Sequence, residues 1–550
     1  MSTLTESTAA HVPMGGVAPS TRRVMNLAHF LTQAARRHPQ AAAITHGAQQ
    51  LSWSELEQRS TMLAHAMHQH GIRKGDRVLT HSKNCIDMVL VLFATLRLGA
   101  VWVPTNFRIS PDEAVYLAEA SGAIAFFCHQ DFPEHAQAVH HAMPDMCLRA
   151  QIGSDTPDTP LQCGSIHLSD LMQRANGQSV ATADVEHDDP CWFFFTSGTT
   201  GKPKAAVLTH GQMAFVVTNH LCDLMPGTTQ SDVSLVVAPL SHGAGIHYVT
   251  QVARAVHSIL PAGDRMDGTE IWQLVERHRV SNMFTVPTIV KLLVEHPSVD
   301  QYDHSSLRYM IYAGAPMYRE DQKYALQKLG PVLVQYFGLG EVTGNITVLP
   351  PAQHSMDDAA TRVGSCGHER TGMQISIQDD NGHELPAHAS GEICVCGPAV
   401  FAGYYNNPEA NRKSFRNGWF RTGDLGYLDA EGYLYITGRQ SDMYISGGSN
   451  IYPREIEEKV LSHPAIAETA VLGIPDPTWG EVGVMVCVLR DGQTITTDAL
   501  HDWMAPRMAR YKLPKHIFFW DALPRSGYGK ITKKLVRETL YERGDLPTPG

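Results

Sequence analysis

The stretch Phe193-Phe194-Phe195-Thr196-Ser197-Gly198-Thr199-Thr200-Gly201-Lys202-Pro203-Lys204 decides how the chain is interpreted. An apolar run ending in hydroxyl and glycine residues predicts a strand followed by a loop. Its free backbone N–H groups can bind phosphate oxygens, and lysine charge lies beside them. It is not a Walker A motif, which needs four residues between its glycines and Ser or Thr after the lysine. Composition alone is equally consistent with a flexible turn between strand and helix.

The composition is that of a soluble globular protein of two to four domains, since 43% of the 550 residues are hydrophobic and 18% are charged. A net charge of -11 lacks the basic excess of a nucleic-acid-binding protein. The most apolar stretch, residues 86–103, carries Asp87 and Arg97, which favours a buried helix running into a strand over a membrane span. We therefore expect neither a nucleic-acid partner nor a transmembrane segment.

The ten cysteines include no CxxC pair, so we expect free thiols in a reducing cytoplasm. The first residues are rich in small and polar side chains and lack the basic start and apolar core of a secretory signal. Residues 1–22 are therefore expected to form a flexible N-terminal tail.

The body of the chain alternates short β-rich runs with helical stretches, the pattern of largely parallel sheets flanked by helices. The strands are expected near residues 77–81, 123–128, 191–196, 233–238, 309–313 and 332–336. From Gly391, short strands between Gly, Asn and Asp clusters predict a small antiparallel, barrel-like unit. After Gly438, a polar Gly-rich stretch precedes Pro453 and an acidic helix, so a small α+β domain begins there.

The phosphate-loop stretch resembles the signature of the acyl- and aryl-CoA synthetases, adenylate-forming enzymes that include 4-coumarate ligases, fatty acyl-CoA ligases and luciferases. Further matches follow in family order over residues 28–542: APLSH (238–242), YAGAP (312–316), QYFGLGE (335–341), GYY (403–405), GWFRTGD (418–424), GR (438–439) and PRSGYGK (524–530). The resemblance implies an AMP-binding N-terminal domain over 23–438, a hinge at 439–442 and a mobile C-terminal domain over 443–550.

The same resemblance implies a two-step reaction that uses ATP, Mg²⁺ and coenzyme A. The carboxylate of an acid attacks the α-phosphate and releases pyrophosphate, and the thiol of coenzyme A then displaces AMP. Activation is needed because a free carboxylate repels nucleophiles and would have to expel oxide. Two anions meet in the first step, so the site needs cations and preorganised N–H donors.

The matched positions imply the residues of the nucleotide site. Those expected to bind ATP or AMP are Thr196, Ser197, Gly198, Thr199, Thr200, Gly201, Lys204, Gly314, Ala315, Pro316, Tyr336, Phe337, Gly338, Asp424 and Arg439. Within this set, Thr196 and Glu341 would position Mg²⁺, and Asp424 would accept hydrogen bonds from the ribose hydroxyls.

Three residues are expected to carry the chemistry: Lys530, Glu341 and His242. Lys530 would bridge the carboxylate and the α-phosphate, and His242 would stand at the mouth of the acyl pocket. The C-terminal domain would rotate about Ser441 between the two steps and bring Gly447 and Gly448 to the coenzyme A channel. The expected acyl pocket comprises His242, Gly245, His247, Tyr248, Ala313 and Tyr336.

Three positions depart from the family pattern. Gly340 stands where the family commonly has a Thr whose hydroxyl contacts the α-phosphate, and either Thr343 or a backbone N–H at Gly340 could supply that donor. Tyr336 stands where the family often has Gly, so it should reshape or shorten the acyl pocket. Ser441 replaces the usual Asp or Lys at the hinge.

The expected substrate is a monocarboxylic acid with a fatty or aryl tail, because no cationic residue is evident for a second carboxylate. Transfer of the acyl group to a carrier protein, or a non-CoA reaction of the luciferase kind, is the related alternative. A dehydrogenase is disfavoured because the glycine spacing in residues 338–344 is wrong for a dinucleotide loop. A non-catalytic binding protein and a homodimer are left open.

Overall fold

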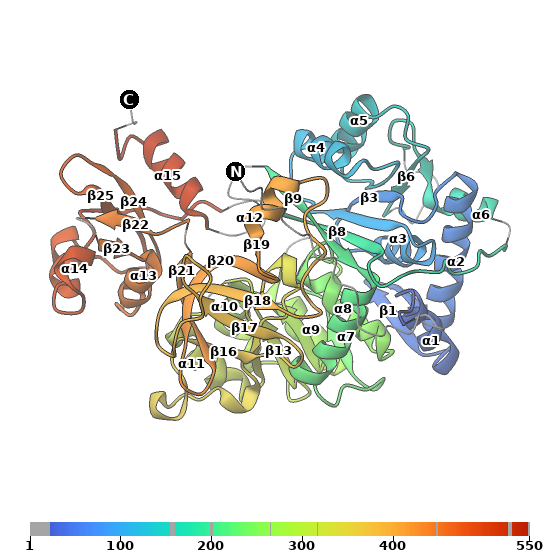
Figure 1. Cartoon of the computed structure of the whole chain (residues 1–550). Helices are drawn as coiled ribbons and strands as arrows, with labels where there is room; N and C mark the ends of the chain where they lie inside the picture. The colour runs from blue at the N-terminus through green and yellow to red at the C-terminus, as the bar shows by residue number, and fades with distance from the viewer. Residues whose placement is uncertain are drawn as a thin grey trace, which may run out of the picture.

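Four β-sheets organise the chain in the computed structural model (Figure 1). The structure describes residues 23–153, 160–175, 177–197, 202–263, 266–315, 317–439, 441–446, 449–525 and 531–547. The predicted tail, residues 1–22, lies outside these ranges. Within them, no helix is long and apolar enough to cross a membrane.

The first sheet contains the strand that leads into the phosphate-loop stretch. It is parallel except for the antiparallel pair β8–β9. Its order is β7 (Ile166–His167), β6 (Leu148–Ile152), β5 (Ala125–His129), β3 (Arg77–His81), β4 (Val101–Thr105), β8 (Pro190–Ser197) and β9 (Pro203–Thr209). The apolar stretch at 86–103 forms α3 (Ile86–Arg97) followed by β4, as predicted. Nearly every side chain of α3 is buried, as expected of a helix that is apolar on all faces.

The second sheet carries the opposite wall of the site. It is parallel apart from the β1–β2 hairpin, in the order β14 (Leu333–Gln335), β13 (Tyr309–Tyr312), β12 (Asn282–Thr285), β10 (Val233–Leu235), β11 (His257–Leu260), β1 (Ala42–His46) and β2 (Gln49–Ser52). The carboxyl ends of β13 and β14 lead directly into the predicted nucleotide-binding segments. Parallel sheets place ligands at that edge.

Helices cover both parallel sheets (Figure 1). They are α1 (His29–Arg37), α2 (Trp53–Gln69), α4 (Pro111–Ser121), α5 (Pro133–Ala142), α6 (Leu168–Arg174), α7 (His210–Asn219), α8 (Gly243–Ala253), α9 (Gly268–His278), α10 (Pro287–Glu295) and α11 (Arg319–Leu329). Helix α7 begins at His210 because the Thr209 side chain caps it and Gln212 completes a capping box. A π-helical turn, η1 (His220–Leu224), follows α7 directly.

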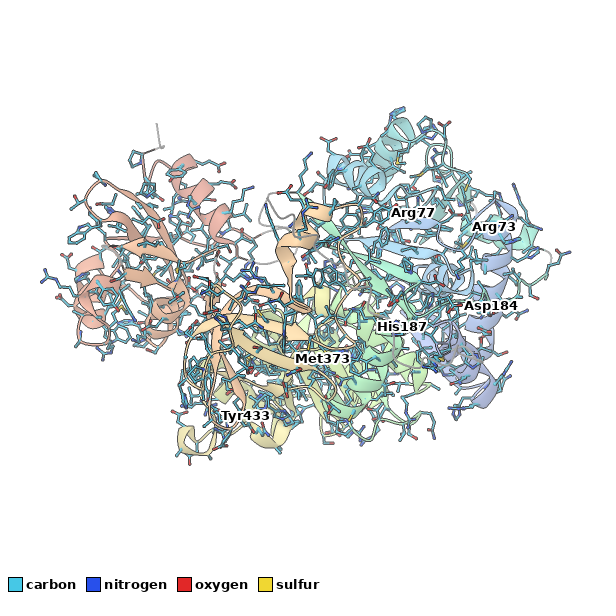
Figure 2. The ribbon with its side chains drawn as sticks, in the orientation of Figure 1. Arg73, Arg77, Asp184, His187, Met373 and Tyr433 are labelled. Atoms are coloured by element: carbon cyan, nitrogen blue, oxygen red, sulfur yellow. The ribbon has the colours of Figure 1, made fainter. Side chains whose placement is uncertain are left out.

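The third sheet is antiparallel, as predicted from Gly391 onward, but it begins earlier in the chain, at Thr347. Its strands are β15 (Thr347–Val348), β16 (Ser365–Glu369), β21 (Tyr433–Arg439), β20 (Trp419–Leu428), β18 (Gly391–Cys396) and β17 (Gln374–Gln378), with β19 (Phe415–Arg416) paired to β20 and α12 (Pro408–Ser414) beside it. Met373, just before β17, and Tyr433, the first residue of β21, mark this sheet in Figure 2. The architecture confirms the predicted mixed α/β class with its antiparallel component.

The fourth sheet belongs to the C-terminal region, which has its own apolar clusters. It contains β23 (Ser449–Ile451), β22 (Tyr444–Ser446), β25 (Gly480–Leu489), β24 (Ile466–Asp476) and β26 (His516–Phe519), with α13 (Pro453–Leu461), α14 (Thr497–Met504) and α15 (Lys533–Glu542). Tyr318, in the segment before α11, packs against the cluster that includes Tyr444 and Ile456. All ten cysteines are free thiols, as predicted.

Candidate active site

Two hydroxyl groups converge on one carboxylate oxygen at the end of β8. Thr196 Oγ1 donates to Glu341 Oε1 over 2.8 Å, and the Tyr404 hydroxyl donates to the same oxygen over 2.9 Å. Glu341 lies in the 3₁₀ turn η3 (Gly340–Val342), and its carbonyl oxygen accepts the Phe401 N–H over 2.8 Å. Two distant segments, the end of β8 and residues 401–404, therefore hold Glu341, which is only 6% exposed.

A cation lies beside this carboxylate. Lys204 on β9 is the register partner of Thr196, and its Nζ lies 5.1 Å from the centre of the Tyr404 ring. Ser197 ends β8, while Gly198, Thr199, Thr200 and Gly201 lie outside the described residues. Tyr404 thus contacts the Glu341 carboxylate through its hydroxyl and the Lys204 ammonium group through its ring, at the base of the predicted phosphate loop.

The donor set around Glu341 suits Mg²⁺ bound together with a polyphosphate. Mg²⁺ usually takes one or two protein carboxylates and completes its shell with phosphate oxygens and water. Both hydroxyls use Glu341 Oε1, so they leave the other carboxylate oxygen for a cation. In the described part of the chain, no group of three or more His, Cys, Asp or Glu side chains could hold a metal without a substrate.

At the predicted ribose site, Asp424 pairs with Arg439. Arg439 Nε donates to Asp424 Oδ1 over 2.8 Å, while Asp424 Oδ2 is buried and accepts no hydrogen bond from any described residue. Burial raises the pKa of Asp424, and the charge of Arg439 opposes that shift. The pKa of Arg439 is raised in turn by the neighbouring carboxylate. A buried acceptor oxygen without a donor fits a ligand hydroxyl.

The predicted adenine-binding segments leave the second sheet side by side. Gly314 follows β13 with a φ of +83°, a left-handed conformation that favours glycine, and Ala315 beside it is exposed. Phe337 follows β14, and its N–H donates to Thr347 Oγ1 over 3.2 Å. A Cβ at Gly338 would lie 2.4 Å from Gly344 Cα, so this glycine permits a close backbone approach. Pro316 lies outside the described residues.

His242 precedes α8 at the start of the predicted acyl pocket. Its ring meets Phe194 edge to face at 5.4 Å, and its Nδ1 lies 3.1 Å from Ser241 Oγ. A Cβ on the next residue, Gly243, would lie 2.8 Å from Phe284 and 3.6 Å from the Tyr336 hydroxyl. The mouth at His242 therefore adjoins a wall made by these two rings, whose centres lie 6.1 Å apart.

The other predicted acyl-pocket residues divide between this wall and the protein core. Ala313 lies in one apolar cluster with Tyr336, and the His247 ring lies 6.0 Å from Phe284. Gly245 lies elsewhere, because a Cβ there would meet Leu240 O at 2.0 Å and Trp192 at 2.8 Å. The structure thus places Gly245 in a close packing contact. Tyr248 is 1% exposed within the large apolar core.

Gly340 is explained by its neighbours. A Cβ at this position would lie 2.6 Å from Phe194 Cδ1 and 2.9 Å from Thr196 Cγ2, so a threonine does not fit beside Phe194. Thr343 has a φ of +50°, and its hydroxyl is buried without a hydrogen-bond partner among the described residues. Both donors named for the missing family hydroxyl therefore stay predictions.

The predicted elements of the second step are described only in part. Lys530, Gly447 and Gly448 lie outside the described residues. Ser441 is exposed in a turn where the N–H groups of Asp442 and Met443 both donate to Arg439 O over 3.1 Å. The hinge assigned to residues 439–442 thus begins at the residue that pairs with Asp424.

Comparison with known proteins decides the family. The AMP-binding enzyme model matches residues 31–405, and the AMP-binding enzyme C-terminal domain model matches residues 455–530. The chain belongs to the AMP-binding enzyme family. It is 34% identical over 521 residues to a feruloyl-CoA synthase of Amycolatopsis sp, covering 94% of this chain and 99% of the relative. It is also 34% identical to an indoleacetate–CoA ligase of Aromatoleum aromaticum, with the same coverage.

A solved structure of o-succinylbenzoate CoA synthetase from Bacillus subtilis, in complex with its acyl-adenylate intermediate, matches with a TM-score of 0.78. It is 30% identical and covers 93% of this chain and 97% of its own. This member of the AMP-binding enzyme family is an AMP-forming acyl-CoA synthetase, which uses ATP, Mg²⁺ and coenzyme A to convert a carboxylic acid to its thioester.

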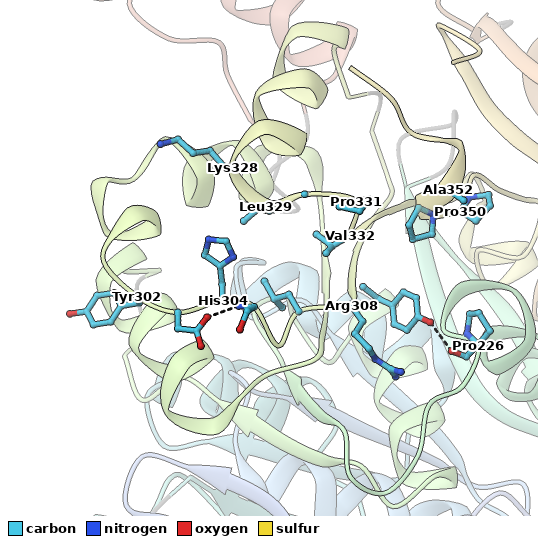
Figure 3. Close-up of a pocket in the computed structure, with 16 residues that line it drawn as sticks. Pro226, Tyr302, His304, Arg308, Lys328, Leu329, Pro331, Val332, Pro350 and Ala352 are labelled. Atoms are coloured by element: carbon cyan, nitrogen blue, oxygen red, sulfur yellow. Dashed lines mark hydrogen bonds between the residues drawn. The ribbon is translucent and has the colours of Figure 1, made fainter. Parts of the chain in front are cut away.

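A surface depression of about 900 Å³ lies away from the site (Figure 3). It is lined by Arg308 and Tyr309 at the start of β13 and by Pro331 and Val332 before β14, and the Tyr309 hydroxyl donates to Pro226 O over 2.6 Å. These are the amino ends of the strands whose carboxyl ends carry the site. The depression therefore lies at the opposite edge of the sheet from the predicted ligands.

Three residues that shape the site were not among those expected from the sequence. Tyr404 holds Glu341, Phe194 explains Gly340, and Arg370 is a fully buried guanidinium near Tyr336. Tyr404 had a signal, because it lies inside the matched segment GYY. Arg370 had none, since an arginine between Glu369 and Thr371 in a Gly-containing turn resembles a solvated residue.

Proposed function

We propose that this synthetase activates a monocarboxylic acid with an aryl or short alkyl tail. The ATP-dependent activation step rests on Glu341 and the two hydroxyls, of Thr196 and Tyr404, that donate to it. Thr196 and Glu341 lie 145 positions apart in the sequence, yet the Thr196 hydroxyl donates to the Glu341 carboxylate at the base of the predicted phosphate loop. That arrangement suits an enzyme that must hold Mg²⁺ against the phosphates of ATP.

In the first half-reaction, a carboxylate oxygen of the acid bonds to the α-phosphorus and the bond to pyrophosphate breaks. Glu341 would hold Mg²⁺ when the cation is bound with ATP. Lys204 adds positive charge beside the phosphates, and Asp424 Oδ2 accepts a hydrogen bond from a ribose hydroxyl. Lys530 from the C-terminal domain neutralises the charge that the carboxylate and α-phosphate share. Preorganised charges of this kind supply much of an enzyme's rate enhancement.

In the second half-reaction, the thiol sulfur of coenzyme A attacks the acyl carbonyl and AMP leaves. The C-terminal domain, residues 443–550, turns about the segment 439–442 so that Gly447 and Gly448 line the thiol channel. His242 stands at the mouth, where its contact with Phe194 positions the ring. Lys530 is then away from the nucleotide.

The substrate assignment rests on the wall formed by Phe284 and Tyr336. The Tyr336 side chain is 8% exposed and stacks on Phe284 at an interplanar angle of 25°. Two aromatic rings at the mouth favour a flat or short acyl group over an extended fatty chain. We also infer a cytoplasmic enzyme, supported by the free cysteines, and a homodimer, which multi-angle light scattering tests directly.

The function is tested by pyrophosphate release with coenzyme A, ATP and a panel of aryl and alkyl acids. We expect acid-dependent release in the native enzyme and a loss of about 10²- to 10³-fold in Glu341→Gln. Glu320→Gln is the matched control, because Glu320 is exposed and, among the described residues, forms an ion pair with Lys323 alone. Equal activity of both variants would remove Glu341 from the site.

A further inference from the structure

A buried polar layer lies behind the ring of Tyr336. It is formed by His220 and Asp223 of η1 and by Arg370, which follows β16. Arg370 is 1% exposed; its Nη2 lies 3.3 Å from His220 Nδ1, and its Nε lies 3.8 Å from Asp223 Oδ2. A π-helical turn at this place is notable, because such turns are rare and frequent at functional sites.

The guanidinium of Arg370 is incompletely paired. Its Nε and Nη1 have no hydrogen-bond partner in the described part of the chain. His220 Nδ1 also lies 3.1 Å from Val216 O, so it cannot both donate to that carbonyl and accept from Arg370. A buried donor without an acceptor destabilises the folded state, so each such group calls for an explanation.

Asp223 does not complete the pairing. Its Oδ2 accepts from the Thr371 N–H over 2.8 Å and from Asn219 Nδ2 over 3.1 Å, and its Oδ1 accepts from the Thr371 hydroxyl over 2.9 Å. The carboxylate is therefore committed to neighbours other than the guanidinium. It balances the charge of Arg370 without satisfying its N–H groups.

A continuous row of side chains connects this layer to the mouth of the acyl pocket. Gly243 adjoins Phe284 and the Tyr336 hydroxyl, and the Tyr336 ring lies 6.4 Å from that of His220. The next contact along the row is the one between His220 and Arg370. The row therefore runs from Gly243, beside His242, through Tyr336 and His220 to the guanidinium of Arg370.

Helix α8 carries further buried polar side chains at increasing distance from Gly243. Gly243, His247 and Gln251 are spaced four residues apart and share one face, so His247 and Gln251 lie about 6 and 12 Å below Gly243. Gln251 Nε2 lies 2.8 Å from His247 Nε2, and Asn282 Oδ1 lies 3.1 Å from both. His247 Nδ1 and Gln251 Oε1 are buried without partners in the ranges described.

The charges of the layer favour a neutral partner. Asp223 already balances Arg370, and burial, followed by the charge of Arg370, lowers the pKa of His220 so that its ring is neutral. A second carboxylate entering here would lose its hydration without gaining an unbalanced cation. A hydroxyl or carbonyl oxygen accepts the free N–H groups at a much smaller desolvation cost.

We propose that Arg370 selects acids that carry a neutral hydrogen-bond-accepting oxygen, a hydroxyl or a ketone, at the end remote from the reacting carboxylate. The proposal rests on the proposed function, because it places this oxygen at the far end of the acyl pocket. The unpaired atoms are enclosed by their neighbours, so the acid reaches them when the ring of Tyr336 turns aside. Arg370 is then a residue that sets substrate specificity.

The test compares kcat/KM for pyrophosphate release in two matched pairs of acids. The pairs are 3-phenylpropionate with 3-(4-hydroxyphenyl)propionate, and hexanoate with 6-hydroxyhexanoate; adipate tests a second carboxylate. We expect the native enzyme to prefer the oxygenated member of at least one pair by about tenfold or more, because a site built to bind a hydroxyl rejects the analogue lacking it. Arg370→Met should abolish the preference.

Two further variants keep the test decisive if Arg370→Met folds poorly. Arg370→Met with Asp223→Asn removes both charges together and should also lose the preference, as measured on protein with a cooperative thermal transition. Arg362→Met is the control, because Arg362 pairs with Asp429 at the surface, and it should retain the preference.

Each outcome bears on a different statement. Activity on the unsubstituted acids with no preference for the oxygenated ones overturns recognition by Arg370 and leaves the ligase assignment standing. A preference that survives in Arg370→Met, or a higher kcat/KM for adipate than for 6-hydroxyhexanoate, also overturns the proposal. Absence of release with every acid overturns the proposed function as well.

Discussion

Asp424 and Arg439 face each other as register partners on β20 and β21, joined by a hydrogen bond of 2.8 Å. The pair links the predicted ribose-binding carboxylate to Arg439, the first residue of the proposed hinge. The Asp424 side chain is 5% exposed, whereas that of Arg439 is 57% exposed. The Asp424 side chain is therefore held inside the sheet, whereas Arg439 lies at the point where the chain leaves the sheet.

Asp424→Asn should weaken ATP binding, because the amide cannot accept from the ribose as a carboxylate does. We expect KM for ATP to rise by about tenfold or more, on the scale of one charge-assisted hydrogen bond. Burial raises the pKa of Asp424. As the pH falls, the carboxylate therefore takes up its proton at a higher pH than an ordinary aspartate does, and the activity of the native enzyme should be lost with it. Asp424→Asn should lack this acid limb.

Asp380→Asn is the control for this prediction, because Asp380 is exposed in a turn. It should keep both the native KM and the native pH profile. An unchanged KM for ATP in Asp424→Asn would show that the buried Oδ2 does not contact the nucleotide.

Gly340→Thr should damage the enzyme even though it restores the common family residue. The new Cβ would lie 2.6 Å from Phe194, so either ring or turn must move. We expect a loss of about 1 to 3 kcal/mol of stability, as is typical of overpacking, together with reduced adenylation. Adding Phe194→Ala should recover at least part of both, measured by thermal unfolding and pyrophosphate release.

The two positions should be coupled because their side chains compete for one space. Phe194→Ala alone serves as the reference for the cycle. If the losses of Gly340→Thr and Phe194→Ala simply add in the double variant, the steric explanation of Gly340 is wrong.

Lys530→Ala should separate the two half-reactions. The ammonium is needed only while the carboxylate and α-phosphate meet, so adenylation should fall by about 10²- to 10³-fold while thioester formation from supplied acyl-AMP is largely kept. The neighbouring Lys534→Ala is the control, since Lys534 pairs with Glu538 on the exposed face of α15. Equal loss in both half-reactions would contradict the assigned role.

Tyr336→Gly should lengthen the acyl pocket. It removes a ring that stacks on Phe284 and restores the residue that the family often has here. We expect the ratio of kcat/KM for decanoate over hexanoate to rise by about tenfold or more, in line with the discrimination typical of apolar pockets. Tyr302→Gly, at the remote surface depression, should leave the ratio unchanged. A constant ratio in Tyr336→Gly would show that the ring does not limit the pocket.

Most of the fold was predictable because its signals are local. The expected strand at 77–81 coincides with β3, and the apolar stretch at 86–103 divides into α3 and β4. The expected strand at 233–238 is shorter in the structure, since β10 ends at Leu235. Apolar runs and turn residues locate elements, but their ends depend on which neighbouring strand supplies hydrogen bonds.

The site was predictable only where a matched motif named its residues. Thr196 and Glu341 were expected to share a cation, and they are hydrogen-bonded. The crowding of Gly340 by Phe194 and the burial of Arg370 had no local signal. Both depend on contacts between segments far apart in the chain, which no pattern along one segment encodes.

The packing of Tyr318 against the C-terminal cluster has a consequence for turnover. The Tyr318 ring is partly buried against that cluster, and burial raises the pKa of its phenol. If the C-terminal domain rotates between the two half-reactions, the Tyr318 ring must become exposed to water and be buried again once in each catalytic cycle. The strength of the packing around the Tyr318 ring would then set the lifetime of this domain arrangement. A smaller side chain at this position would shorten that lifetime and speed the rotation.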